Sequence, residues 1–100
     1  MEKLYILLLA GTVFANNPDA LSKAAAALKV GMFKEALLHV NDVQKENPTN
    51  PDVYRMKALL LEALDEPKNA LEAWKNCLEY STDGHISREA NIHIQSLSEK

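Results

Sequence analysis

The amino-acid sequence predicts an all-α fold, a short solenoid of two helical hairpins followed by one terminal helix, and three observations support this prediction. The first is an internal repeat, because a step of 34 residues carries the segment 34–37 onto the matching segment 68–71. The second is the spacing of apolar residues at steps of three and four, as on one face of a helix. The third is the regular punctuation of these segments by glycine, proline and asparagine. Such a period is typical of stacked helical repeats.

The composition indicates one soluble globular domain. The 100 residues are 47% hydrophobic and 25% charged, which is the range of an ordinary packed domain. A formal net charge of -3 with no concentrated basic segment excludes nucleic acid as a partner, because phosphate binding requires a basic face. The single cysteine, Cys77, excludes both a disulfide within the chain and a multi-cysteine metal site.

Residues 1–15 are predicted to be a signal peptide. The apolar run from Leu4 to Phe14 follows a short charged head and is followed by a polar segment, with cleavage expected after Ala15. The run is too short to span a bilayer, so no stable membrane span is expected once it is removed. The predicted location is therefore the periplasm or the exterior. The other interpretation is a retained first helix that packs on the repeats.

The first repeat is predicted over 17–50. Asn17 is a capping residue and Pro18 occupies the first turn of a helix that runs to about residue 30. Gly31 ends this helix, as glycine does in the left-handed conformation, and a second helix follows over 33–46. Two amphipathic helices joined by a short turn form a helical hairpin.

The second repeat is predicted over 51–84, with helices at about 52–64 and 67–80 and a break at the turn before Pro67. The last helix, 85–98, is predicted to be an amphipathic capping helix. The repeat domain as a whole spans 16–100. The capping helix has four apolar residues on one face: Ile86, Ala90, Ile94 and Leu97.

These repeats resemble the tetratricopeptide repeat (TPR) family over about residues 17–84. In this family small residues lie where helices cross closely, and large residues fill the holes opposite. The final helix is similar to the family's solvating cap. The matching residues of the first repeat are Ala24, Phe33, Ala36 and Pro48, and those of the second are Tyr54, Ala58, Leu61, Ala70, Trp74 and Cys77.

No catalytic residues, metal ligands or cofactors are predicted. The histidines His39, His85 and His93 lack the spacing of a metal site and are expected to be solvated. Cys77 has no basic neighbour in the sequence that would lower its pKa, and it falls at a buried position of the repeat. Phosphate-binding loops, serine elbows and paired catalytic carboxylates are also missing from the sequence, so no enzyme is expected.

The resemblance implies a concave groove lined by the first helix of each repeat. The carboxylate-clamping repeats of the family use lysine and asparagine in this groove, whereas Leu21 and Ala25 stand there in this chain, so that activity is not implied. A largely apolar groove with a few charged residues suits an apolar or amphipathic segment. The predicted partner-binding residues are Leu21, Ala25, Leu28, Asp52, Arg55, Met56, Leu59 and Glu62. The alternative for Leu21 and Leu28 is that they complete the core.

The predicted function is that of an exported adaptor that binds a peptide or protein segment without chemistry of its own. The alternative is a structural subunit that self-assembles, or docks into a cell-envelope complex, through its open ends. Solenoids generally need about three repeats, and the chain has two and a half, which leaves apolar end surface to explain. A third interpretation is a cytoplasmic co-chaperone that keeps its first helix.

Overall fold

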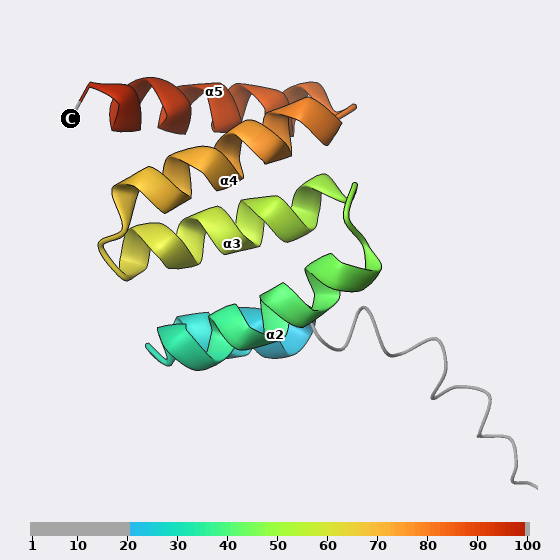
Figure 1. Ribbon diagram of the computed structural model, residues 1–100, viewed down its shortest axis with the longest axis vertical. Helices are drawn as coiled ribbons and strands as arrows, with labels where there is room; N and C mark the ends of the chain where they lie inside the picture. Colours follow the sequence, from blue (N-terminus) through green and yellow to red (C-terminus); the bar gives the residue numbers. More distant parts are fainter. Residues whose placement is uncertain (1–20, 100) are drawn as a thin grey trace, which may run out of the picture.

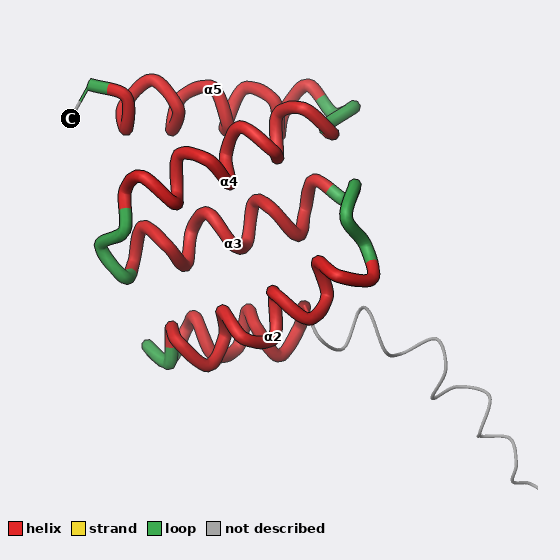
Figure 2. The backbone as a smooth tube through the Cα atoms, viewed as in Figure 1, coloured by secondary structure: helices red, strands yellow, loops and turns green. Residues whose placement is uncertain are grey.

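The computed structural model describes residues 21–99, and within this range all regular structure is helical (Figures 1 and 2). Helical residues 21–29 lead into α2 (Phe33–Glu46), α3 (Pro51–Ala63), α4 (Pro67–Tyr80) and α5 (Gly84–Ser98). The predicted helix boundaries in this range are confirmed to within one residue. The predicted signal peptide and the helix start at Asn17 lie outside the described residues.

The helices α2 to α5 lie side by side in chain order, and each runs opposite to the one before it (Figure 1). The helical segment 21–29 packs with α2 as the first hairpin, and α3 with α4 forms the second. The arrangement places the first hairpin at one end of the stack and α5 at the other (Figure 1). None of the helices among residues 21–99 is long and apolar enough to cross a membrane.

The turns inside the two hairpins have the same geometry. Gly31 has φ +84° and Asp65, which lies 34 residues later, has φ 60°. In both turns the next N–H reaches back to the helix, from Met32 to the Ala27 carbonyl and from Glu66 to the Leu61 carbonyl, at 2.8 Å each. This hydrogen bond satisfies a carbonyl that a helix end would otherwise leave unpaired. The expected role of Gly31 is confirmed, and an aspartate performs the same role in the second hairpin.

Side chains cap the amino-terminal ends of α3 and α5. Asn50 Oδ1 accepts a 2.9 Å hydrogen bond from the Asp52 N–H, and Pro51 begins α3. Asp83 Oδ1 accepts from the N–H groups of His85 and Ile86 at the start of α5. These caps supply acceptors to the first N–H groups of each helix, which have no partner within it. They fix the direction in which α3 and α5 enter the stack.

Burial recurs with the period of the sequence repeat. Alanines are buried where the helices meet closely, and larger residues fill the rest of the interior. Four pairs of buried residues lie 34 positions apart: Ala24 and Ala58, Ala36 and Ala70, Val40 and Trp74, and Val43 and Cys77. The core forms two clusters, one centred on each hairpin, and the second extends to Ala90 and Leu97 of α5. Trp74 is confirmed as a fully buried residue.

Candidate functional site

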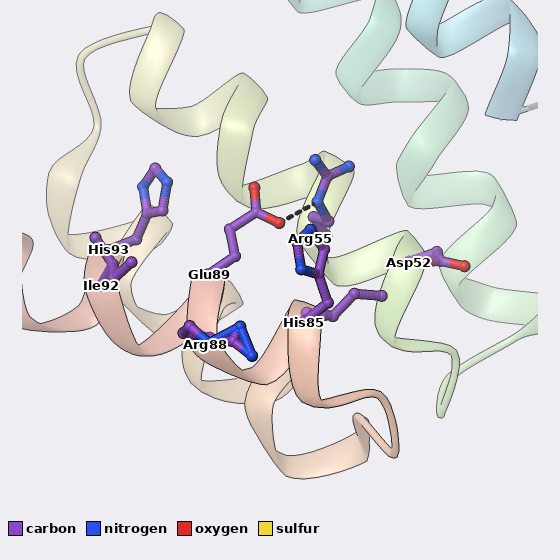
Figure 3. Close-up of a pocket in the computed structure, with 8 residues that line it drawn as sticks. Asp52, Arg55, His85, Arg88, Glu89, Ile92 and His93 are labelled. Carbon is purple, nitrogen blue, oxygen red and sulfur yellow. Dashed lines mark hydrogen bonds and ion pairs between the residues drawn. The ribbon is translucent and has the colours of Figure 1, made fainter.

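An open pocket of about 420 Å³ lies between α3 and α5 (Figure 3). We call it the α3–α5 groove. The groove combines charged, imidazole and aliphatic side chains, and its wall on α3 contributes only two of them. The lining residues are Asp52 and Arg55 from α3, and His85, Ile86, Arg88, Glu89, Ile92 and His93 from α5.

An ion pair crosses the floor of the groove. Arg55 Nε donates to Glu89 Oε1 at 2.7 Å, and the two residues are 34 positions apart (Figure 3). The hydrogen bond that Arg55 donates to Glu89 raises the pKa of Arg55 above its usual value, although partial burial opposes this shift. Because both side chains are about a third exposed, the pair contributes at most about 1 kcal/mol to stability. The pair bridges α3 and α5 across the groove.

One groove residue, His93, belongs to a network of three side chains. The Trp74 and His93 rings stack with centroids 4.2 Å apart. Glu62 Oε2 accepts a hydrogen bond from Trp74 Nε1 at 2.6 Å and lies 2.7 Å from His93 Nδ1. The expectation that all three histidines are solvated is therefore wrong for His93, because a buried indole and a carboxylate both engage its ring. His85 is exposed and His39 is half-buried.

Several groups in the groove remain available for a ligand. Arg88 and Asp52 are exposed, and neither forms an ion pair with another residue of the range 21–99. Ile92 keeps 61% of its surface exposed in the same groove. The groove thus offers a cation, an anion and an apolar side chain to a bound molecule.

The predicted groove residues divide into three groups. Asp52 and Arg55 line the pocket, as described above. Glu62 bonds to Trp74 and His93 rather than facing the pocket. The remaining five are half-buried: Leu21, Leu28 and Met56 pack on the core cluster of the first hairpin, Leu59 packs on the cluster of the second, and Ala25 lies on the helical segment 21–29.

The sequence prediction missed the contribution of α5. Its capping face is confirmed, because Ala90 and Leu97 are buried and Ile86 and Ile94 pack against the core. The groove residues on α5 carried a signal, since the step of 34 from Asp52, Arg55 and Leu59 reaches Ile86, Glu89 and His93. Extending the repeat beyond residue 84 would have identified them.

Among residues 21–99, no three histidine, cysteine, aspartate or glutamate side chains gather as they would around a metal ion. Cys77 is fully buried, and burial raises the pKa of its thiol to about 11. A thiol in this environment is protonated at neutral pH and is a poor nucleophile.

No family model matches the sequence, and neither a curated protein nor a solved structure does. The side chains of the α3–α5 groove are therefore the basis for assigning a function.

Proposed function

We propose that this protein is a non-enzymatic adaptor that binds a peptide or protein segment in the α3–α5 groove. One observation carries the proposal: along the groove lie the exposed Ile92, then Arg88 and then Asp52 (Figure 3), and the charges of Arg88 and Asp52 are unpaired within residues 21–99. An apolar anchor surrounded by polar groups is the usual composition of a site that binds a protein segment.

We also propose that the chain is a TPR-like protein. Two observations support this assignment: the burial pattern recurs every 34 residues, and the turns at Gly31 and Asp65 are equivalent. In this assignment α3 and α5 are both first helices of a repeat, and the groove between them is the ligand-binding face. The resemblance and the pocket then agree on the same surface.

The charges of the groove define the ligand. An apolar side chain of the segment would pack on Ile92 and Ile86, which line one wall. A carboxylate of the segment would pair with Arg88, and a basic group would pair with Asp52. Because the Arg55–Glu89 pair is already formed, it would contribute shape rather than a free charge. The ligand is therefore an amphipathic segment that presents an apolar, an acidic and a basic residue in this order along the groove.

Selection from a random peptide library on the immobilised protein tests this proposal. A selected peptide, labelled and measured by fluorescence anisotropy, should lose affinity for Ile92→Asp by about tenfold or more, because the exposed apolar contact of the groove is replaced by a charge. The matched control is Leu38→Asp, which changes another exposed apolar residue far from the groove. Circular dichroism should show both variants folded.

Two results would contradict the groove assignment. One is the failure of any library peptide to bind the parent at high micromolar concentration. The other is a set of selected peptides whose affinity Ile92→Asp leaves unchanged. A peptide that loses affinity for Leu38→Asp instead would place the binding surface at the opposite end of the stack.

Export with cleavage after Ala15 completes the proposal. It is supported by the apolar run between Leu4 and Phe14 and the polar residues that follow it. The intact mass of protein recovered from its native host should correspond to a chain that begins at Asn16. Full-length chain recovered from the cytosol would overturn both the cleavage and the location.

A further inference from the structure

The two ends of the helix stack have different surfaces. The large apolar residues with the greatest exposure among those described are Val30 at 71%, Leu38 at 66%, Ile92 at 61% and Met32 at 49%. Ile92 belongs to the groove, whereas the other three belong to the first hairpin. Val30 and Met32 line a shallow hollow of about 370 Å³ together with Lys23, Ala26 and Glu35, and Leu38 lies one turn further along α2. We call this surface the amino-end face.

In the second hairpin, the surface that corresponds to the amino-end face is covered by the first hairpin. A step of 34 residues carries Ala26 and Val30 of the amino-end face onto Leu60 and Leu64 of α3. Leu60 is fully buried, because it packs into the core cluster of the first hairpin, whereas Ala26 is exposed. The amino-end face is therefore the surface by which one hairpin of this chain stacks on another, and in the first hairpin it has no hairpin to pack on within residues 21–99.

The opposite end of the stack is finished by polar residues. Ala90 and Leu97 turn inward from α5 to the core. Apart from Gly84 and Ile92, the exposed residues of α5 are polar: His85, Arg88, Asn91, Gln95, Ser96 and Ser98. Head-to-tail stacking of two molecules would cover the apolar amino-end face with this polar surface, which would leave polar groups desolvated without partners.

We propose that the amino-end face binds a second copy of itself, giving a closed dimer with two-fold symmetry. A two-fold contact places the same patch of each molecule against the other, so the apolar residues meet apolar residues. The charges at the edge fit this arrangement, because Lys23 and Glu35 line the same hollow and carry opposite signs. Across the axis, Lys23 of one copy can pair with Glu35 of the other. Because the dimer buries the amino-end face of both copies, no third copy can bind through this face.

The dimer leaves the α3–α5 grooves free. Their residues belong to α3 and α5, and α5 lies at the opposite end of the stack from the first hairpin (Figure 1), so each dimer presents two binding sites. Two linked sites bind a ligand with two copies of a motif more tightly than either site alone, because the second binding event becomes intramolecular. The dimer itself does not depend on the proposed function of the groove.

Sedimentation equilibrium of the protein as its host produces it, with its intact mass measured in parallel, tests the dimer. The parent should give twice the chain mass at micromolar concentration. Leu38→Asp should halve that mass across the whole range, because it places two like charges at an apolar contact. Ile92→Asp, a matched change at the other end, should remain dimeric. Lys23→Glu and Glu35→Lys should each weaken the dimer, and the two together should restore it.

A parent that is monomeric at all concentrations would overturn the dimer, whether the amino-end face is then covered by residues 1–15 or by another partner. A mass that keeps increasing with concentration would indicate open head-to-tail assembly and would also overturn it. A dimer that survives Leu38→Asp, with circular dichroism unchanged, would place the contact elsewhere. If Ile92→Asp loses the selected peptides but stays dimeric, the groove and the dimer are separate properties.

Discussion

The two hairpins share a backbone arrangement but differ in the size of the side chains that fill it. Alanines are buried at the same repeat positions, 24 and 58 as well as 36 and 70, so the helices of both hairpins can approach closely. At the next position Val40 of the first hairpin corresponds to Trp74 of the second, and both are fully buried. Small residues therefore allow the same close helix packing in both hairpins, and we expect the larger buried residue, Trp74, to make the second hairpin the more stable.

The two hairpins also differ in the polar and aromatic contacts of their side chains. In the second hairpin the buried indole of Trp74 bonds to Glu62, and the Tyr54 hydroxyl donates a 2.6 Å hydrogen bond to the Pro48 carbonyl. The Tyr54 and Tyr80 rings stack with centroids 5.7 Å apart. The buried residues that the first hairpin itself contributes within residues 21–46 are alanine and valine, with larger side chains only half-buried around them, and its outer face is exposed. We therefore expect the second hairpin and α5 to be the stable part of the chain.

The sharpest test of this comparison substitutes the same repeat position in both hairpins. Trp74→Ala should lower the free energy of unfolding by about 3 to 5 kcal/mol, because it leaves a large cavity in the core. Val40→Ala should cost only about 1 to 2 kcal/mol, because it removes two methyl groups. Urea titration followed by circular dichroism measures both. Equal losses would show that the two hairpins contribute alike.

The Cys77 thiol provides a second test, in the same core. Its pKa is raised to about 11 from an ordinary value of 9.0 by burial, so near neutral pH its thiolate fraction is lower than that of a free thiol by about 100-fold. Reaction with a thiol reagent at pH 8 should therefore be slow until urea unfolds the chain. Rapid reaction of the folded protein at that pH would show that the core around α4 opens readily.

The raised pKa of Cys77 also makes the stability of the fold depend on pH in the alkaline range. The folded state holds the thiol proton more tightly than the unfolded chain does, so the thiol's contribution to stability is complete below pH 9 and is lost as the pH rises from 9 to about 11. Cys77→Ala should remove this part of the alkaline destabilisation.

The smallest expected effect concerns the two equivalent turns. Asp65 adopts the left-handed conformation that Gly31 adopts in the first hairpin, and a side chain is strained there. Asp65→Gly should therefore raise the free energy of unfolding by about 0.5 to 1 kcal/mol, and Gly31→Ala should lower it by about 1 kcal/mol. Thermal melts of the two variants measure the pair. Destabilisation by Asp65→Gly would show that the aspartate side chain supports its turn.

The sequence was sufficient to predict the helices because local signals mark their ends. Gly31 permits the positive φ at which the first helix ends, whereas Pro51 and Pro67 fix φ at a value that suits the first turn of a helix. The resemblance also identified residues that the structure buries, Ala36 in α2 and Ala70, Trp74 and Cys77 in α4, whereas the buried Ala73 was not predicted. Asp65 was not predicted to adopt a positive φ, because aspartate adopts that conformation only where the surrounding turn requires it.

The site was less predictable than the fold. Asp52 and Arg55 were identified because the resemblance places first helices along the groove. The stacking of His93 on Trp74 could not be predicted, since it depends on how the side chains of α4 and α5 pack together. Glu62 was predicted to line the groove because it lies on a first helix of a repeat. Its position on the helix does not reveal that its carboxylate bonds to Trp74 and His93.

Amide chemical-shift mapping with a library-selected peptide tests whether the α3–α5 groove binds a protein segment. We expect the largest shift changes on α3 near Arg55 and on α5 from Ile86 to His93. Amides of the amino-end face, such as those of Val30 and Leu38, should remain unchanged at protein concentrations where the dimer is fully formed. Changes confined to the amino-end face, with the α5 signals unmoved, would contradict binding in the groove.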